Sequence, residues 1–247
     1  MTNLTDRPDQ AHQTGQDLAG YAWTALPRAA FDLETTGPDP QSARILSASV
    51  VMVDAAGGIS EQWDWLADPG VPIPEASTAI HGITTERVRK EGRPLREVAS
   101  ELAAVLRGCA LQGTPVVAFN ASYDFTVLDR ECHRLGLNPP PTGPVIDPYI
   151  LDKQVDRFRK GKRTLVALCE QYGIDLEQAH TASADALAAL RLAEAQAATF
   201  AELRIPATGL HQLQKIWARE QAASFQSYLH RQGRLDAVID GTWPVLL

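Results

Sequence analysis

Two carboxylates lie two residues apart in the sequence AFDLETTGP, residues 30–38. Side chains two apart in a β-strand point to the same face, so Asp32 and Glu34 are expected side by side at the end of an apolar strand. Two unit charges about 4 Å apart repel by about 4 kcal/mol at an effective dielectric near 20. No lysine or arginine lies between Arg28 and Arg44 to offset this repulsion. The pattern therefore indicates a site where cations supply the positive charge.

Two further acids are predicted to lie in the first turn of a helix. The sequence FNASYDF, residues 119–125, places Asp124 there, and HTASAD, residues 180–185, does the same for Asp185. Taken singly, each also fits the ordinary preference of acids for helix N-termini. Ligands in α/β proteins gather at strand ends and helix N-termini, so the four acids are expected to converge.

The composition of this group points to hard metal ions. Oxygen ligands without cysteine favour Mg²⁺ or Mn²⁺ over zinc. Mg²⁺ takes only one or two protein carboxylates, so four acids suit two ions that also bind a phosphodiester. Two ions about 3.5–4 Å apart stabilise both the attacking and the leaving oxygen of an in-line displacement. A base that titrates near neutral pH is still needed, and His180 in the preceding loop meets that need.

The three acidic segments together carry a family resemblance. FDLETTG, NASYDF and HTASAD resemble the three motifs of the DEDDh exonuclease superfamily, which includes the proofreading epsilon subunit of bacterial DNA polymerase III, RNase T and oligoribonuclease. The resemblance runs from about residue 28 to residue 196, and HGIT (81–84) and GKRTLVALCEQYGI (161–174) are also similar to epsilon-type sequence. It implies an RNase H-like fold and removal of nucleoside 5′-monophosphates in the 3′→5′ direction.

The resemblance also implies a role for each acidic residue. Asp32, Glu34 and Asp185 would hold one divalent ion, and Asp32 would bridge to a second ion near Asp124. His180 would be the general base.

Four other residues are expected to bind substrate. The resemblance implies that the backbone of Thr35 contacts the terminal sugar, that His81 lines the pocket for the terminal nucleotide, and that Asn120 faces the substrate backbone. Arg163 ends the basic stretch 157–163, and its charge, rather than any family motif, indicates contact with upstream phosphates. Ordinary alternatives are a turn role for His81, a partner for loop backbone in the case of Asn120, and a solvated loop for the basic stretch.

Apolar periodicity predicts the elements that position these residues. They form an α/β fold, an RNase H-like mixed β-sheet flanked by helices, with a C-terminal helical extension. Strands are expected at 29–34, 43–54, 59–69 and 114–120, with a short strand or extended segment in PVIDPYIL, 144–151. Helices are expected at 94–108, 122–136, 163–173, 183–204 and 207–232.

The chain divides into three predicted segments. Residues 1–26 are expected to be a disordered tail, 27–204 the exonuclease domain and 205–247 the helical extension. The extension lies outside the resemblance. It is expected either to pack on the domain or to dock a DNA polymerase or a second copy of the chain.

Composition limits the class of protein. The 247 residues are 45% hydrophobic, and no apolar run reaches the roughly 18 residues of a membrane span, so a cytoplasmic protein without membrane contact is expected. Cys109, Cys132 and Cys169 form no CxxC pair and are predicted to be buried thiols. The net charge of −7 argues against broad non-specific nucleic-acid binding but allows a local basic patch.

These observations predict a two-metal 3′→5′ exonuclease. Its expected substrate is the 3′ end of single-stranded or frayed DNA, favoured over RNA because of the epsilon-like HGIT and GKR segments. The alternatives are an exoribonuclease acting on short RNA, a proofreading subunit bound to a DNA polymerase, a non-catalytic nucleic-acid-binding protein, and a phosphoesterase of small nucleotides.

Overall fold

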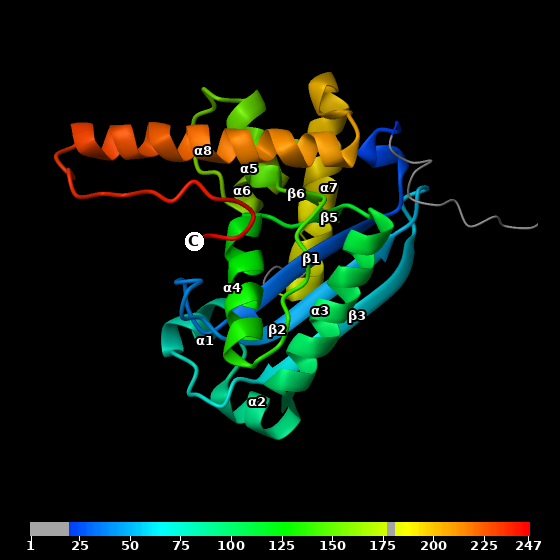
Figure 1. Cartoon of the computed structure of the whole chain (residues 1–247), viewed down its shortest axis with the longest axis vertical. Coiled ribbons are helices and arrows are strands. Elements are labelled where there is room, and N and C mark those ends of the chain that lie inside the picture. The colour runs from blue at the N-terminus through cyan, green and yellow to red at the C-terminus, as the bar shows by residue number, and fades with distance from the viewer. Residues whose placement is uncertain (1–19, 177–180) are drawn as a thin grey trace, which may run out of the picture.

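A six-stranded mixed sheet forms the centre of the computed structural model, which describes residues 20–176 and 181–247 (Figure 1). The strand order is β4-β3-β2-β1-β5-β6. Strands β1, β2 and β3 are antiparallel, whereas β4 joins β3, and β5 and β6 follow β1, in parallel. The strands are β1 Arg28–Thr35, β2 Ile45–Val53, β3 Ile59–Asp68, β4 Arg93–Pro94, β5 Val116–Val117 and β6 Val145–Ile146. This is the mixed sheet that the sequence predicts.

Helices cover both faces of the sheet. α3 and α4 pack on one face and α7 packs on the opposite face (Figure 1). The helices are α1 Glu75–His81, α2 Thr85–Glu91, α3 Leu95–Gln112, α4 Ala121–Arg134, α5 Pro148–Val155, α6 Leu165–Tyr172, α7 Ala182–Thr199 and α8 Ala207–Arg231. Short 3₁₀ turns lie at Trp23–Ala25 and Ala201–Leu203.

The alternation along β1 decides which face receives the acids. Phe31 and Leu33 are buried in the core that β1 shares with α3 and α4. Ala30 belongs to the core on the α7 side. Because side chains two apart share a face, Asp32 and Glu34 point towards α7, and they lie on one face as the sequence predicts.

The end of β1 that carries these acids extends beyond its parallel neighbour. β5 pairs only with Ala29 and Ala30 of β1. The chain then leaves β5 and begins α4 at Ala121. The N-terminus of α4 therefore lies beside the part of β1 that β5 does not reach.

The expected strand or extended segment at 144–151 is correct only at Val145–Ile146. From Pro148 the chain forms α5, so the prediction was wrong there. Asp147 accepts a hydrogen bond from the backbone N–H of Tyr149, and proline occupies the first helical position. An N-cap acid followed by proline is a helix-start signal, which the apolar character of the stretch outweighed in the prediction. α1 and α2 also lie in a stretch for which the sequence predicts no helix.

The expected disordered tail at 1–26 is only partly open to comparison. Residues 1–19 lie outside the described residues, but Trp23 is fully buried. Its indole Nε1 donates to the carbonyl of Leu203 at 3.0 Å, and its backbone N–H donates to that of Ile205 at 3.1 Å. The prediction was wrong for residues 23–26. These residues are ordered by contacts with Leu203 and Ile205, which are distant in the sequence and cannot be seen in the local composition.

Side chains of α8 supply hydrogen-bond partners along the outer side of β6. Gln214 Oε1 accepts the N–H of Asp147 at 2.7 Å, and its Nε2 donates to the carbonyl of Val145 at 3.0 Å. His211 Nδ1 accepts the N–H of Val145 at 3.1 Å. The predicted final helix thus packs on the domain as α8 (Figure 1). The domain boundary at 204/205 stays a prediction.

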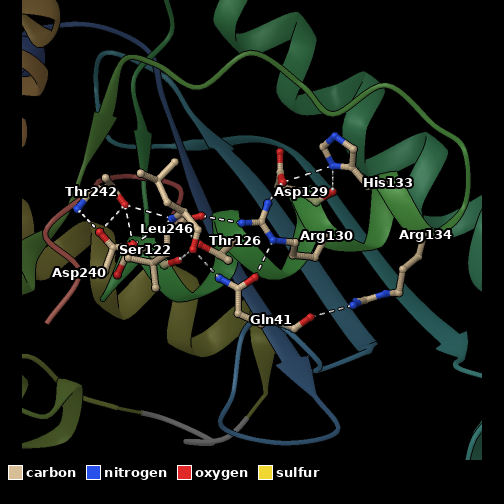
Figure 2. Close-up of polar contacts among 11 residues, drawn as sticks. Gln41, Ser122, Thr126, Asp129, Arg130, His133, Arg134, Asp240, Thr242 and Leu246 are labelled. Carbon is tan, nitrogen blue, oxygen red and sulfur yellow. Dashed lines mark hydrogen bonds and ion pairs between the residues drawn. The ribbon is translucent and has the colours of Figure 1, made fainter. Parts of the chain in front are cut away.

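The segment after α8 returns to α4 (Figure 2). The backbone N–H of Leu246 donates to Thr126 Oγ1 at 2.9 Å. Arg130 donates to the carbonyl of Leu246 at 2.7 Å and to Gln41 Oε1 at 2.6 Å. The end of the chain therefore joins α4 to the loop that follows β1.

Two expectations from composition concern cysteines and membranes. Cys109, Cys132 and Cys169 are all buried and unpaired, which confirms the predicted buried thiols. In residues 20–176 and 181–247, no helix is both long and apolar enough to cross a bilayer.

Candidate active site

The candidate active site forms where β1, α4 and α7 meet. One carboxylate oxygen from each of Asp32, Glu34 and Asp185 lies within 4.8 Å of the others. All three side chains are partly buried. The structure therefore brings together three of the four predicted metal ligands, although Asp185 is about 150 residues distant from the other two in the sequence.

Local structure fixes the position of Asp185. Thr181 caps α7 by accepting the N–H of Ala184, and Asp185 lies in the first turn. Further along α7, Glu194 accepts a hydrogen bond from Arg28 Nε at 2.6 Å, at the start of β1. α7 is therefore held along β1 by packing and by this ion pair. The helix dipole also favours a carboxylate at its N-terminus.

Asp124 approaches from the other side of β1. Its Oδ1 accepts the backbone N–H of Leu33 at 3.1 Å, and Leu33 lies between the two acids of the strand. The Asp124 side chain is almost completely buried. This contact is possible because β5 ends before it reaches this part of β1. The fourth predicted ligand therefore lies next to the other three.

Burial and mutual repulsion make this group hard to ionise without a cation. Burial, and next the charges of Asp124, Glu34 and Asp185, raise the pKa of Asp32 well above its ordinary value. Burial and the charge of Asp185 raise the pKa of Glu34 to about 7. Burial also raises the pKa of Asp124 well above its ordinary value, and the hydrogen bond from Leu33 opposes that shift.

The group fits a divalent metal site. Its donors are carboxylate oxygens, the ligands preferred by Mg²⁺ and Mn²⁺. Their spacing allows three oxygens to reach one ion. A bound cation would also lower the raised pKa values, because it favours the ionised form of each carboxylate.

A cavity of about 310 Å³ opens beside Glu34. His81 lines it together with Trp65 and Leu66 of β3 and Ile83. His81 ends α1, and its Nδ1 accepts the N–H of Ile83 at 3.0 Å, which fixes the ring orientation. The predicted nucleotide-pocket residue therefore does line a pocket next to the acidic group.

Three other predicted residues either do not line this cavity or lie outside the described residues. Thr35 is buried, and its hydroxyl donates to the carbonyl of Gly37. Asn120 lines a separate cavity at the N-terminus of α4. His180 lies outside the described residues, so its role as general base stays a prediction.

The predicted phosphate contact of Arg163 also stays a prediction. Its guanidinium contacts the fully buried carboxylate of Asp152 and donates to the carbonyl of Asp156 at 2.6 Å. Arg159 Nε lies 3.5 Å from the same carboxylate. Two cations of the basic stretch therefore hold its loop in place.

Sequence reasoning missed Tyr123, which positions the loop after β1. The Tyr123 hydroxyl contacts both the Thr35 hydroxyl and the carbonyl of Gly37. It is adjacent to Asp124, so the same turn of α4 contacts the end of β1 twice. The spacing of the tyrosine gave no signal for this role.

Sequence reasoning also missed Asp147, which holds the N-terminus of α4. This carboxylate is 1% exposed. It accepts the backbone N–H groups of Asn120 and Ala121, each at 2.9 Å, and of Tyr149 at 3.0 Å, and the indole N–H of Trp243 at 3.4 Å. Asn120 has a φ of 56°, a left-handed conformation that asparagine adopts more readily than most residues. The dipeptide Asp147–Pro148 was the available signal, as an N-cap pattern.

Asp147→Ala is expected to lower the free energy of unfolding by about 3 kcal/mol, because it leaves four N–H donors without their acceptor, two of them buried and two partly buried. It is also expected to slow catalysis, because Asn120 and the helix that carries Asp124 lose their support. Urea unfolding measures the first effect. Asp54→Ala is the control, because exposed Asp54 also accepts two backbone N–H groups, in the β2–β3 turn. This variant should lower the free energy of unfolding much less. Equal losses from the two variants would contradict the role assigned to Asp147.

Comparison with known families agrees with this geometry. The sequence profile of the exonuclease family (RNase T) matches residues 29–193, which include all four acids. The chain belongs to this exonuclease family. Its motifs are those of the DEDDh type, whose members are 3′→5′ exonucleases and phosphodiester hydrolases.

Curated relatives give a second comparison. The chain is 35% identical over 162 residues to a DNA polymerase III subunit epsilon-like protein of Rhodobacter capsulatus, covering 64% of this chain and 22% of the relative. It is 32% identical over 163 residues to the PolC-type DNA polymerase III of Streptococcus mutans, covering 66% of this chain and 10% of the relative. The chain thus spans less than a quarter of the length of either relative.

Solved structures confirm the RNase H-like exonuclease fold. Exonuclease I matches with a TM-score of 0.62 and 18% identity, over 72% of this chain and 42% of that protein. The structure of E. coli exonuclease I in complex with a dA16 oligonucleotide matches with a TM-score of 0.63 at the same identity and coverage.

Proposed function

We propose that this chain is a metal-dependent exonuclease that removes nucleoside 5′-monophosphates from the 3′ end of single-stranded or frayed DNA. One observation carries the proposal: the carboxylates of Asp32, Glu34 and Asp185 converge within 4.8 Å, with Asp124 adjacent. Family membership supports the direction of cleavage.

The four acids have distinct places in the proposed site. Asp32, Glu34 and Asp185 would hold one divalent ion, and Asp32 with Asp124 would hold a second. When bound, two Mg²⁺ or Mn²⁺ ions would supply charge stabilisation at the attacking and leaving oxygens of the phosphodiester. His180 accepts the proton of the attacking water, a role that the sequence motif supports.

The cavity beside Glu34 suits the terminal nucleotide. Trp65 and Leu66 give it apolar walls, and His81 gives it a polar group fixed in orientation. Its volume of about 310 Å³ lies at the lower end of the range for small-molecule sites, which fits one nucleotide. Thr35 at the end of β1 lies next to Glu34 and would contact the terminal sugar.

DNA is favoured as substrate over RNA. The relatives are named as DNA polymerase III proteins, and exonuclease I has been solved with a DNA oligonucleotide. The relatives' names also support the second candidate function, a proofreading subunit that works with a DNA polymerase. Co-purification with a polymerase would favour that candidate.

The direct test uses a 5′-labelled single strand of about 16 nucleotides, a length within the range that single-strand-binding folds cover. We expect stepwise shortening from the 3′ end with Mg²⁺ or Mn²⁺, complete inhibition by EDTA, and faster cleavage of DNA than of RNA with the same sequence. Full-length substrate under every metal condition would refute the nuclease activity. Faster cleavage of RNA would instead establish the exoribonuclease. Cleavage restricted to mononucleotide esters, without dependence on polymer length, would indicate a phosphoesterase of small nucleotides.

A further inference from the structure

A groove runs between α5 and α8, away from the carboxylates. Its volume is about 800 Å³. One wall comes from α5 and the residues just after it, and the other comes from one face of α8. α8 lies outside residues 29–193, the part of the chain that matches the exonuclease family. We call this feature the α5–α8 groove; its lining includes Tyr149, Lys153, Arg157, Gln221, Phe225 and Tyr228.

The α5–α8 groove is basic in a protein whose net charge is −7. Lys153, Arg157 and Arg163 line it, against a single acid, Glu220. Arg163 is engaged with Asp152, but within the described part of the chain no ion pair joins Lys153 or Arg157 to a carboxylate. Among the described residues, Arg157 therefore faces the groove without an ion pair, and Lys153 is attracted by the Asp147 carboxylate but forms no ion pair with it, so both can contact an anionic ligand.

The groove also presents aromatic rings to solvent. Phe225 and Tyr228 lie three residues apart on α8, and each is 49% exposed. Their ring centroids are 6.4 Å apart and the ring planes differ by only 14°. The Lys153 ammonium lies 4.7 Å from the centre of the Tyr149 ring on the opposite wall. Half-exposed, nearly parallel rings next to cations are the combination that binds single-stranded nucleic acid, because bases stack on the rings while cations contact phosphates.

A second cavity extends the α5–α8 groove towards the N-terminus of α4. A second cavity of about 260 Å³ shares Tyr149, Lys153, Gln221 and Phe225 with it. This second cavity extends to Asn120 and Ser122 at the N-terminus of α4. Asp124 lies in the first turn of the same helix. The second cavity therefore brings the groove to within one helical turn of Asp124 along α4.

We propose that the α5–α8 groove binds the nucleotides upstream of the 3′ end of a single-stranded substrate. This inference rests on the proposed exonuclease function and adds the path of the strand to it. Lys153 and Arg157 contact backbone phosphates, and Phe225 and Tyr228 stack on bases. The groove recognises the polymer and not its sequence, because every base has a face that can stack and every linkage carries a phosphate.

Binding is tested without catalysis, by fluorescence anisotropy in EDTA. The probe is a 5′-labelled oligothymidylate of about 16 nucleotides, compared with one of about 3 nucleotides. The double variant Lys153→Met with Arg157→Gln is expected to raise Kd for the longer probe about tenfold and to lower the salt slope by about 1.4, since each single-strand phosphate contact contributes about 0.7. The double variant Phe225→Ala with Tyr228→Ala is expected to raise Kd by about 30-fold or more and to leave the salt slope unchanged. For both variants the loss should be much smaller with the short probe.

Two controls match these variants. Arg89→Gln with Lys90→Met removes the same charge from the exposed face of α2 and should leave Kd within about twofold of the wild type, apart from long-range steering. Ile216→Ala removes an apolar side chain that is 51% exposed on α8 but outside the groove. Wild-type affinity in both groove variants would overturn the proposal. So would equal losses with the two probes, or sedimentation showing that the ring variant disrupts a dimer. Failure of the wild type to shorten DNA would refute the exonuclease function, whereas the binding data in EDTA test the groove separately.

Discussion

Asp32→Asn is expected to reduce the rate of nucleotide removal by about 10³-fold or more, since the loss of several kcal/mol of charge stabilisation in the transition state corresponds to that factor. Asparagine keeps the size of the side chain, so the packing of β1 is retained. The variant removes one carboxylate from the group that Asp32 forms with Glu34, Asp185 and Asp124. Asp32 is the residue assigned to both metal ions. Its replacement should therefore reduce the rate more than the replacement of any other single ligand.

The measurement combines the rate with metal binding. Gel analysis of 3′-end shortening gives the rate, and titration with Mn²⁺ followed by electron paramagnetic resonance gives the affinity. Asp68→Asn serves as the control, because Asp68 ends β3 and caps the adjacent turn through the N–H of Gly70. Activity and Mn²⁺ affinity of Asp32→Asn equal to those of the wild type would show that the acidic group is not the reaction centre.

Glu34→Gln is expected to stabilise the metal-free protein at about pH 8, although it abolishes activity. Burial and the charge of Asp185 raise the pKa of Glu34 from 4.5 to about 7. The folded chain therefore holds a proton that the unfolded chain has lost between these two values, and stability falls as pH rises through them. Glutamine does not titrate, so the variant escapes this loss. With screening at this partly exposed site, the gain is on the order of 1–2 kcal/mol.

Thermal unfolding in EDTA at several pH values measures the effect. The difference in Tm between Glu34→Gln and the wild type should be small near pH 4 and should grow towards pH 8. Mn²⁺ should raise the Tm of the wild type at the higher pH, because it binds only the folded chain, and should raise that of Glu34→Gln much less. Glu61→Gln, on the exposed end of β3, is the control and should follow the wild type. A wild-type chain that is more stable than Glu34→Gln at pH 8 without metal would contradict the prediction.

The acidic group was predictable because strong local rules place each member. The period of two along β1 puts Asp32 and Glu34 on one face. The start of α7 can be recognised in the sequence, and this is enough to place Asp185 in the first turn of the helix. What the sequence does not provide is the partner across the strand. The contact of Asp124 with the N–H of Leu33 depends on β5 being only two residues long, and strand length is set by tertiary packing rather than by the apolar run at 114–120.

The remaining features depend on contacts between distant parts of the chain. In the sequence, Trp23 belongs to a polar tail, whereas in the structure its indole N–H donates to the carbonyl of Leu203. In the sequence, Asp147 lies in an apolar stretch, whereas in the structure its carboxylate accepts the backbone N–H of Asn120 and the indole N–H of Trp243. The α5–α8 groove needs two helices whose relative position no local pattern specifies. The basic stretch was visible in the sequence, but the internal use of Arg163 was not.

The bonds between α8 and β6 have a consequence for any shortened version of this protein. A fragment cut to the family-matched residues 29–193 would lose His211 and Gln214. The backbone groups of Val145 and Asp147 would then lack their hydrogen-bond partners. An exposed strand of this kind can pair with the same strand of another molecule, which leads to aggregation. Truncation at the family boundary should therefore yield self-associating material, and a shortened protein for crystallisation or assay should retain α8.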